Sequence, residues 1–268
     1  MTRKPPEAAT EEATQDRRSG TIQSISIAMR FLQCLATSDR ALPLAELARQ
    51  TDTGRSTAHR YMQSLVKEGL AQQDPVSSHY DLGAGALGIG IAALRRVDAV
   101  ELAGVDMKLL AASHAMSGGV AIWTERGPTV VRWYRSAHFA VTTLQLGDVL
   151  PLDNTACGLV FRAFLPATQV EAVRQVQPGH FRGTPPPETQ IAQVRRDGWA
   201  ELTSHLLADV TGQAAPVFDA QGELVCVLTT VTDLGQLRAP EDRLALLKVA
   251  RGINRATGGD SAWSQAGR

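Results

Sequence analysis

Apolar positions in the N-terminal third of the chain recur at helical spacing until residue 69, where the period changes. Residues 44–48 place an apolar stripe on one short helix, and residues 51–54 then supply turn and N-cap residues. In residues 55–69 a second stripe is formed by Ala58, Tyr61, Met62, Leu65 and Val66. The pattern therefore predicts a helix, a turn and a second helix that ends at Gly69.

The opposite side of the second helix carries hydrogen-bond donors and cations but no acid. Cations bind phosphates, and short or forked polar side chains read base edges in the major groove. Residues 70–73 and 79–82 have strand character around a turn-rich segment at 74–78, which predicts a β-hairpin wing. The expected contacts to double-stranded DNA are Arg55, Ser56, Thr57, His59, Arg60, Gln63 and Lys67. An enzyme or scaffold whose helix-turn-helix contacts protein is the alternative.

This region resembles the IclR family of bacterial transcription regulators. Residues 55–69 read RSTAHRYMQSLVKEG, similar to the family's Ser-Thr-Ala-x-Arg helix with its Leu-x-x-x-Gly exit, and SSHYDLG resembles the Tyr-x-Leu-Gly end of the wing. Later segments resemble further family signatures in the expected order. They are LGDVLPLDNTACGLVFRAFLP (146–166), VRRDGWA (194–200) and AAPVFDAQGELV (214–225), so the resemblance runs from about residue 22 to residue 256.

Composition and period divide the chain into five segments. Residues 1–21 nearly lack large apolar groups and are expected to form a disordered arm. Residues 22–83 form the predicted winged helix-turn-helix domain, and residues 84–97 form a glycine-rich linker helix. Strand-like runs and helices mix in residues 98–258, the predicted effector-binding domain, and residues 259–268 are expected to be a flexible tail.

The second domain is predicted to be α+β, with an antiparallel sheet and flanking helices, because hairpin-joined strands stand on both sides of a helical stretch. The resemblance implies a GAF/PAS-like effector domain. Residues 139–146 are expected to form a third strand of its sheet. Two helix starts are also expected, with Ser24 as one N-cap and Asp98 with Glu101 as a capping pair for the other.

A formal net charge of zero over 268 residues means that DNA binding must rely on local cations. Three widely spaced cysteines form neither a disulfide framework nor a CxxC metal motif, which indicates a reducing, cytoplasmic location. No apolar run reaches membrane-spanning length, and the N-terminus lacks the apolar core of a signal peptide. The sequence therefore predicts no membrane association and no metal site.

Cys157 begins a predicted helix, where the helix dipole would lower the pKa of a thiol. A redox-sensing regulator of the same architecture that uses Cys157 is therefore an alternative. No histidine stands at a motif spacing from it, and the chain shows no set of nucleophile, base and orienting group. We therefore expect neither an enzyme nor a bound cofactor.

The resemblance implies a small-molecule pocket in the second domain. Carried over position by position, its residues are Phe139, Thr142, Leu150, Ala156, Cys157, Leu202, Gly212, Thr229 and Val231. This set is mostly apolar with few polar groups, which suits a small organic ligand. Each residue could instead be ordinary core, and for Leu150 and Val231 taken alone that interpretation is the better one.

Three departures from the family's glyoxylate- and pyruvate-binding type affect the expected ligand. The acid near Leu202 and a second hydroxyl near Val231 are missing, and Asp209 stands where the family has a loop glycine. A tiny keto acid is therefore disfavoured. With Phe139, and with Trp123 and Trp133 on neighbouring strands, the sequence favours an aromatic or other organic acid.

Regulators of this kind bind DNA as symmetric pairs, because one short helix reads too few bases for genomic specificity. The apolar stripe Leu87, Ile91 and Leu94 of the linker helix is the expected pairing surface of a homodimer. The resemblance implies a tetramer built from two dimers. A repressor is expected more than an activator.

Overall fold

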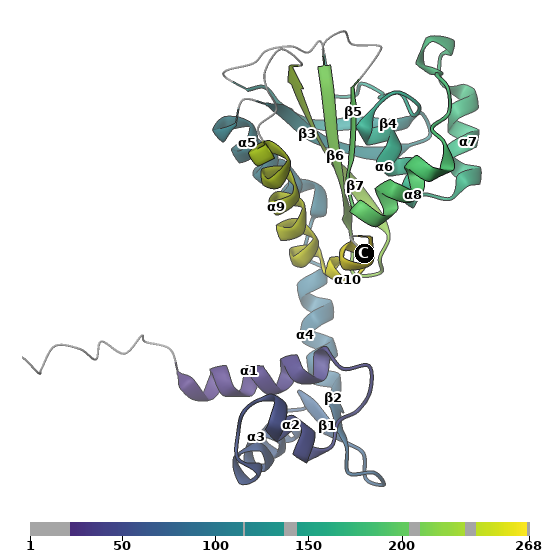
Figure 1. The fold of residues 1–268 in the computed structure, drawn as a ribbon. Coiled ribbons are helices and arrows are strands. Elements are labelled where there is room, and N and C mark those ends of the chain that lie inside the picture. The colour runs from purple at the N-terminus through teal and green to yellow at the C-terminus, as the bar shows by residue number, and fades with distance from the viewer. Residues whose placement is uncertain (1–21, 115, 137–143, 204–209, 234–239, 267–268) are drawn as a thin grey trace, which may run out of the picture. The chain divides into compact units, whose positions relative to one another are not determined.

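The computed structural model describes five stretches of the chain, residues 22–114, 116–136, 144–203, 210–233 and 240–266. The chain divides into two compact units, Met1–Ala93 and Leu94–Arg268, and each is considered by itself (Figure 1). The predicted arm at 1–21 lies outside the described residues. Among the described helices, none is both long and apolar enough to cross a membrane.

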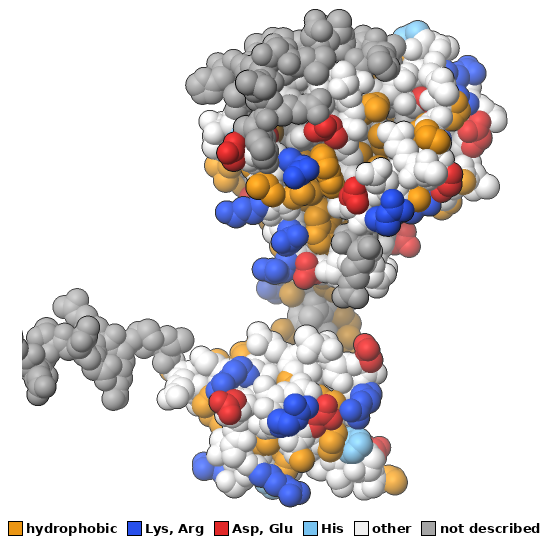
Figure 2. All heavy atoms as spheres, viewed as in Figure 1, with side chains coloured by type: hydrophobic (Ala, Val, Ile, Leu, Met, Phe, Trp, Pro, Cys, Tyr) orange, Lys and Arg blue, Asp and Glu red, His pale blue; other side chains and the backbone are white. Residues whose placement is uncertain are grey.

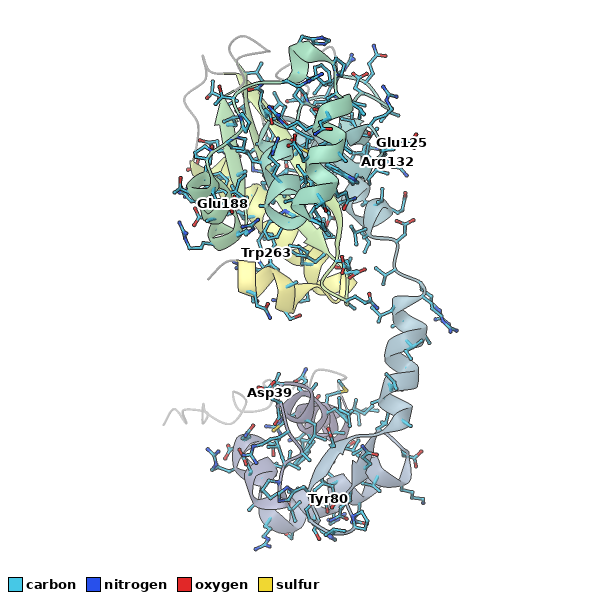
Figure 3. The ribbon with its side chains drawn as sticks, turned by 90° about the vertical axis from the view of Figure 1, so that its right-hand side faces the viewer. Asp39, Tyr80, Glu125, Arg132, Glu188 and Trp263 are labelled. Atoms are coloured by element: carbon cyan, nitrogen blue, oxygen red, sulfur yellow. The ribbon has the colours of Figure 1, made fainter. Side chains whose placement is uncertain are left out.

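The first unit is the predicted winged helix-turn-helix. Its helices and strands are α1 (Gln23–Ala36), α2 (Leu44–Gln50), α3 (Arg55–Lys67), β1 (Ala71–Gln73), β2 (Tyr80–Leu82) and α4 (Ala84–Leu94). Phe31, Leu47 and Met62 are fully buried in one core with Tyr80, which Figure 3 labels. Leu42 exchanges two backbone hydrogen bonds of 2.8 Å with Tyr80, which ties the wing to the chain before α2.

Helix ends in this unit depend on backbone chemistry more than on side-chain caps. Gly69 follows α3 with φ +71°, a left-handed conformation that favours glycine. A Cβ on Gly85 would lie 2.8 Å from the Gly69 carbonyl oxygen, so glycine allows α4 to start against the exit of α3. The expected N-cap at Ser24 is wrong: α1 begins at Gln23, and Ile22 occupies the cap position without a side-chain hydrogen bond.

The second unit is built on an antiparallel sheet in the order β4-β3-β7-β6-β5. Its strands are β3 (Ser117–Thr124), β4 (Gly127–Tyr134), β5 (Ala200–Thr203), β6 (Val210–Phe218) and β7 (Leu224–Asp233). Its helices are α5 (Ala99–Ser113), α6 (Ala156–Phe164), α7 (Ala167–Val176), the 3-10 turn η1 (Gly179–Phe181), α8 (Glu188–Asp197), α9 (Pro240–Thr257) and α10 (Asp260–Ala266).

Helices cover both faces of this sheet, as Figure 1 shows. Met107 of α5 and Leu246 of α9 share a core with Val120 and Leu228 on one face. Leu159 of α6 and the facing residues of α8 form a second core on the other face. The predicted α+β architecture, with an antiparallel sheet and flanking helices, is therefore confirmed.

Local expectations in this unit had mixed outcomes. Asp98 caps α5 by accepting hydrogen bonds from the backbone N–H groups of Val100 (2.9 Å) and Glu101 (3.0 Å), as predicted, whereas the Glu101 carboxylate pairs with Arg132 at 3.1 Å. Residues 139–143 of the expected third strand lie outside the described residues, and residues 144–146 are not in a strand. The expectation of a flexible tail at 259–268 is wrong over α10, because Trp263 (Figure 3) packs into the core and is 7% exposed.

Candidate DNA interface and effector cavity

The solvent-facing side of α3 holds the whole predicted DNA-binding set. Ala58 and Met62 are fully buried and Leu65 is 5% exposed, so these residues fix which side of the helix faces the core. The exposed residues of α3 include all seven predicted contacts, Arg55, Ser56, Thr57, His59, Arg60, Gln63 and Lys67. Figure 2 shows Lys and Arg side chains on the visible surface of this unit.

The cations of α3 are not neutralised by neighbouring acids. In the described part of the chain no ion pair joins Arg55, Arg60 or Lys67 to a carboxylate. By contrast, Arg40 and Arg49, which lie outside α3, both approach Glu46, at 3.1 and 3.9 Å. The positive charge of α3 is therefore free to meet phosphate.

The wing next to α3 is a two-stranded hairpin with a structured tip. Asp74 accepts hydrogen bonds from the backbone N–H groups of Ser77 (2.6 Å) and Val76 (3.0 Å), and from the Ser77 hydroxyl at 2.8 Å. These bonds, chiefly that from the Ser77 backbone, hold the pKa of the Asp74 carboxyl below its usual value. Val76 stands out from the tip at 93% exposed. The turn is therefore locked locally while its tip stays available for contact.

Seven of the nine predicted effector residues line one cavity of about 50 Å³, called here the inner cavity. They are Leu150, Ala156, Cys157, Leu202, Gly212, Thr229 and Val231. Phe139 and Thr142, the other two, lie outside the described residues, as does Asp209. Residues 144, 155, 133 and 210 also line the cavity but were not in the predicted set. Strand alternation from Gly212 points to Val210, so that residue could have been inferred.

The inner cavity forms where α6 starts above the sheet. The Thr155 hydroxyl caps α6 by accepting a hydrogen bond from the Gly158 N–H at 2.9 Å, and it donates to the Pro151 carbonyl at 2.7 Å. A Cβ on Gly158 would lie 2.7 Å from that carbonyl, so glycine allows this close turn. On the sheet, Gly212 pairs with Val231, which places both on the same face. The start of α6 and the paired strands β6 and β7 thus bring residues that are distant in the sequence to one cavity.

Cys157 does not have the environment of a reactive thiol. It is 1% exposed, and burial raises the pKa of its thiol far above the ordinary value, with Cys226 nearby adding to the rise. The expectation that the start of the helix would lower this pKa is therefore wrong, because desolvation outweighs the helix dipole. Cys34 and Cys226 are also buried and free, and burial raises the pKa of Cys226 to about 12.

One polar atom near the inner cavity has no partner. Trp133 lines the cavity, and its indole Nε1 is buried without a hydrogen-bond partner in the described part of the protein. The Thr229 hydroxyl, by contrast, donates to the Gln213 carbonyl at 3.3 Å. An indole N–H can only donate, and this one is closed to solvent, so an acceptor oxygen of a ligand reaches it only when the cavity widens.

Comparison with known families matches both units. Residues 24–75 match the IclR helix-turn-helix domain, and residues 91–255 match the family described as the C-terminal domain of the bacterial transcriptional regulator IclR. The second match alone spans more than half of the chain. The chain therefore belongs to the IclR family of bacterial transcription regulators, with a DNA-binding and an effector-binding domain.

Individual relatives agree with this assignment. The glycerol operon regulatory protein of Streptomyces coelicolor is 28% identical over 247 residues, which cover 88% of this chain and 97% of the relative. The transcriptional repressor IclR of Escherichia coli is 22% identical over 271 residues, 95% of each chain. The crystal structure of Pseudomonas aeruginosa HmgR has a TM-score of 0.77 at 32% identity, covering 89% of this chain and 99% of that one. The protein is a regulator and not an enzyme.

Proposed function

We propose that this protein is a ligand-responsive repressor that binds operator DNA through α3 and its wing. The observation that carries the proposal is the exposed, acid-free side of α3 with its three unpaired cations. Repression is supported by relatives whose own names describe them as repressors, among them IclR of Escherichia coli. Because bacterial DNA lies in the cytoplasm, the proposed activity places the protein there.

Arg60 projects from the middle of the exposed side of α3 and is proposed to reach a guanine edge or a phosphate. Arg60→Ala should weaken binding to the operator by about 1–3 kcal/mol and relax its specificity. Lys67→Ala should weaken binding to all sequences alike and reduce the salt dependence, as expected for a phosphate contact. Fluorescence anisotropy on DNA that flanks the protein's own gene measures both effects.

The matched control is Arg196→Ala, which removes an exposed arginine of α8 in the other unit and should leave the affinity for DNA unchanged. Operator binding by Arg60→Ala that equals wild type at several salt concentrations would show that α3 does not read the DNA. In that case a helix-turn-helix that contacts protein becomes the better interpretation.

The proposed effector is an aromatic or other organic acid held in the inner cavity. The largely apolar wall suits an apolar body, and the unpartnered indole N–H of Trp133 suits a carboxylate or hydroxyl oxygen. At about 50 Å³ the cavity is far smaller than the roughly 300–1,000 Å³ of typical small-molecule sites, so a larger effector must enlarge it. A thermal-shift screen of organic acids tests for ligands, because a ligand that binds only the folded state raises the melting temperature.

We also propose a homodimer, and a tetramer built from two dimers. Helix α4 buries none of its residues, although it is almost entirely apolar, and Leu87, Ile91 and Leu94 are 66%, 42% and 41% exposed. A helix of this composition is normally covered in a soluble protein. Light scattering coupled to size-exclusion chromatography measures the assembly, and a strictly monomeric protein would exclude it.

A further inference from the structure

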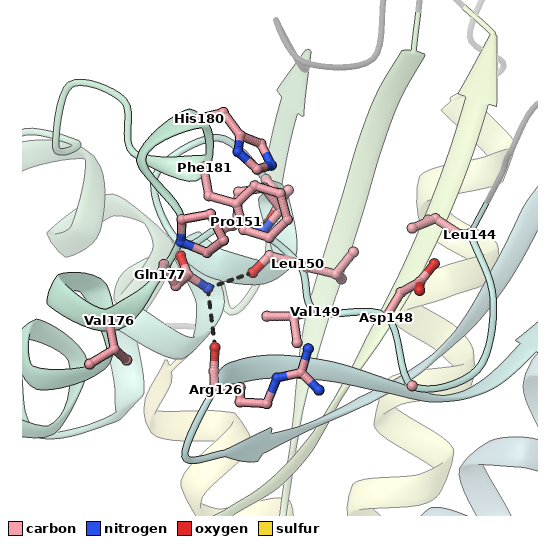
Figure 4. A pocket seen from close by; sticks show the side chains of 13 residues that line it. Arg126, Leu144, Asp148, Val149, Leu150, Pro151, Val176, Gln177, His180 and Phe181 are labelled. Carbon is pink, nitrogen blue, oxygen red and sulfur yellow. Dashed lines mark hydrogen bonds between the residues drawn. The ribbon is translucent and has the colours of Figure 1, made fainter.

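A second and much larger hollow lies beside the inner cavity in the effector unit. This outer pocket has a volume of about 690 Å³, within the range of small-molecule sites, whereas the inner cavity has about 50 Å³. The two share wall residues Leu144, Leu150 and Thr155. Figure 4 shows the outer pocket between the β3–β4 hairpin, the loop before α6 and the segment after α7. Of the seven predicted effector residues that the structure describes, Leu150 alone lines the outer pocket.

The floor of the outer pocket is held by a buried glutamine. Gln177 is 3% exposed, and its Nε2 donates to the carbonyl of Leu150 at 3.1 Å and to that of Arg126 at 3.4 Å (Figure 4). Its Oε1 accepts a hydrogen bond from the Leu152 N–H at 3.2 Å. One side chain thus connects the hairpin, the loop before α6 and the end of α7. The pocket is therefore formed in advance of any ligand.

The segment that carries Phe181, one of the lining residues, is held by an ion-pair network behind the pocket. The Asp153 side chain is 1% exposed and pairs with Arg162 and, at 2.9 Å, with Arg174. It also accepts a hydrogen bond from the Gly183 N–H at 3.1 Å, which anchors the segment just after Phe181. This anchoring holds η1, with Phe181, in place at the rim of the pocket.

The lining of the outer pocket combines apolar walls with one cationic side chain that has no ion-pair partner among the described residues. Leu150, Pro151 and Phe181 provide apolar walls. In Figure 4 the guanidinium of Arg126 extends along the pocket toward Val149, and no ion pair involves it in the described residues. The other ionisable groups are Asp148, which already accepts a hydrogen bond from the Gln145 N–H at 2.8 Å, and His180.

We propose that the outer pocket is a second small-molecule site, specific for a carboxylic acid with a flat apolar body. The apolar body packs between Leu150, Pro151 and Phe181, and the carboxylate binds the Arg126 guanidinium. Arginine is suited to this role because its planar fork matches a carboxylate with two parallel hydrogen bonds. Although the two cavities share three wall residues, the proposed carboxylate contact, Arg126, lines only the outer pocket.

The test uses 4-bromophenylacetate as the probe and the full-length protein in isothermal titration calorimetry. Wild type should bind it saturably in the millimolar range and bind the neutral 4-bromophenylacetamide about tenfold or more weakly. Arg126→Gln, at an exposed hairpin position, should weaken the acid by a similar factor without affecting the amide. Val176→Trp, at a rim position that is 70% exposed, should weaken both by steric blockage.

Matched controls are Arg196→Gln for the charge and Val105→Trp for the bulky side chain, and both residues are exposed and far from the lining in sequence. A crystal soaked with the acid should show the anomalous signal of bromine in the outer pocket. Absence of saturable binding, equal binding of acid and amide, or bromine in the inner cavity alone would each overturn the proposal. None of these readouts involves DNA, so they are independent of the proposed operator binding.

Discussion

Asn254 shows how a single buried side chain determines the packing of α9 on the sheet. It is fully buried, and its Nδ2 donates to the carbonyls of Pro216 (3.0 Å) and Ala250 (2.8 Å), while its Oδ1 accepts from the Phe218 N–H at 2.8 Å. The register of β6 against β7 shifts at Val217/Phe218, so the strand leaves backbone groups there without regular sheet partners. Asn254 satisfies these groups, as buried backbone requires.

Asn254→Ala should therefore destabilise the effector unit strongly. Removing the amide leaves the Phe218 N–H and the Pro216 carbonyl buried without this partner, at a cost of about 1–3 kcal/mol for each such group. Together the two groups cost about 2–6 kcal/mol, so the melting transition of this unit should fall by roughly 4–24 °C, measured by differential scanning calorimetry.

Gln175→Ala, at an exposed position of α7, is the control for loss of an amide and should leave the transition in place. If Asn254→Ala melts within a degree of wild type, water or local rearrangement replaces the amide, and the side chain is not what joins α9 to β6.

Individual site residues were predictable from the sequence to different degrees. Helical spacing alone predicted the DNA-binding side of α3, because the apolar residues recur on the other side. The burial of Ala58 and Met62 agrees with that prediction. The inner cavity joins residues from α6, β5, β6 and β7, which no local pattern connects, and only the resemblance brought them together. The pKa of Cys157 was predicted in the wrong direction, because desolvation depends on tertiary burial that the sequence does not display.

At the scale of elements, long amphipathic helices could be predicted from the sequence. Short helices and strands that form only through contacts with distant residues could not. β5 spans Ala200–Thr203 and exists because it pairs with β6 at the sheet edge, so its own few residues give no alternating pattern. Helix α10 has only one large apolar side chain, Trp263, and forms against a core supplied by the rest of the unit. Both elements depend on distant contacts.

Helix α4 leads to the prediction that belongs to this scale. In the proposed dimer its apolar stripe is buried, although within one chain Leu87 is 66% exposed. Leu87→Lys should therefore leave the folded subunit intact but place an unpaired ammonium in the interface, which is costly to desolvate. We expect the dissociation constant of the dimer to rise about tenfold or more, measured by sedimentation equilibrium or light scattering over a dilution series.

Val76→Lys at the exposed wing tip is the control for an added charge outside α4, and it should not change the mass in solution. A Leu87→Lys protein that keeps the wild-type mass over the whole dilution series would show that α4 does not pair the subunits.

At the scale of the whole molecule, regulation requires coupling between the proposed effector site and the proposed DNA interface. A ligand changes the affinity for DNA only if it binds the DNA-competent and incompetent states unequally, and a coupling of about 1–3 kcal/mol is typical. The inner cavity and α3 belong to different units, so a side chain that fills the cavity need not alter the DNA-binding surface itself.

Thr229→Trp should abolish the effect of an inner-cavity ligand on operator affinity while leaving operator binding itself intact. Thr229 is 5% exposed and lines the inner cavity of about 50 Å³, so an indole there takes the space that the ligand needs. Leu202→Trp, at a half-buried position of the edge strand β5, provides a second blocking variant if the first one folds poorly. Operator affinity is measured by anisotropy with and without an acid that raises the wild-type melting temperature.

The competing explanations give different results: a redox switch would lose its response to peroxide in Cys157→Ser but keep a metabolite response. An undiminished ligand response in both tryptophan variants would place the effector outside the inner cavity, and the same measurement on Val176→Trp would then test the outer pocket.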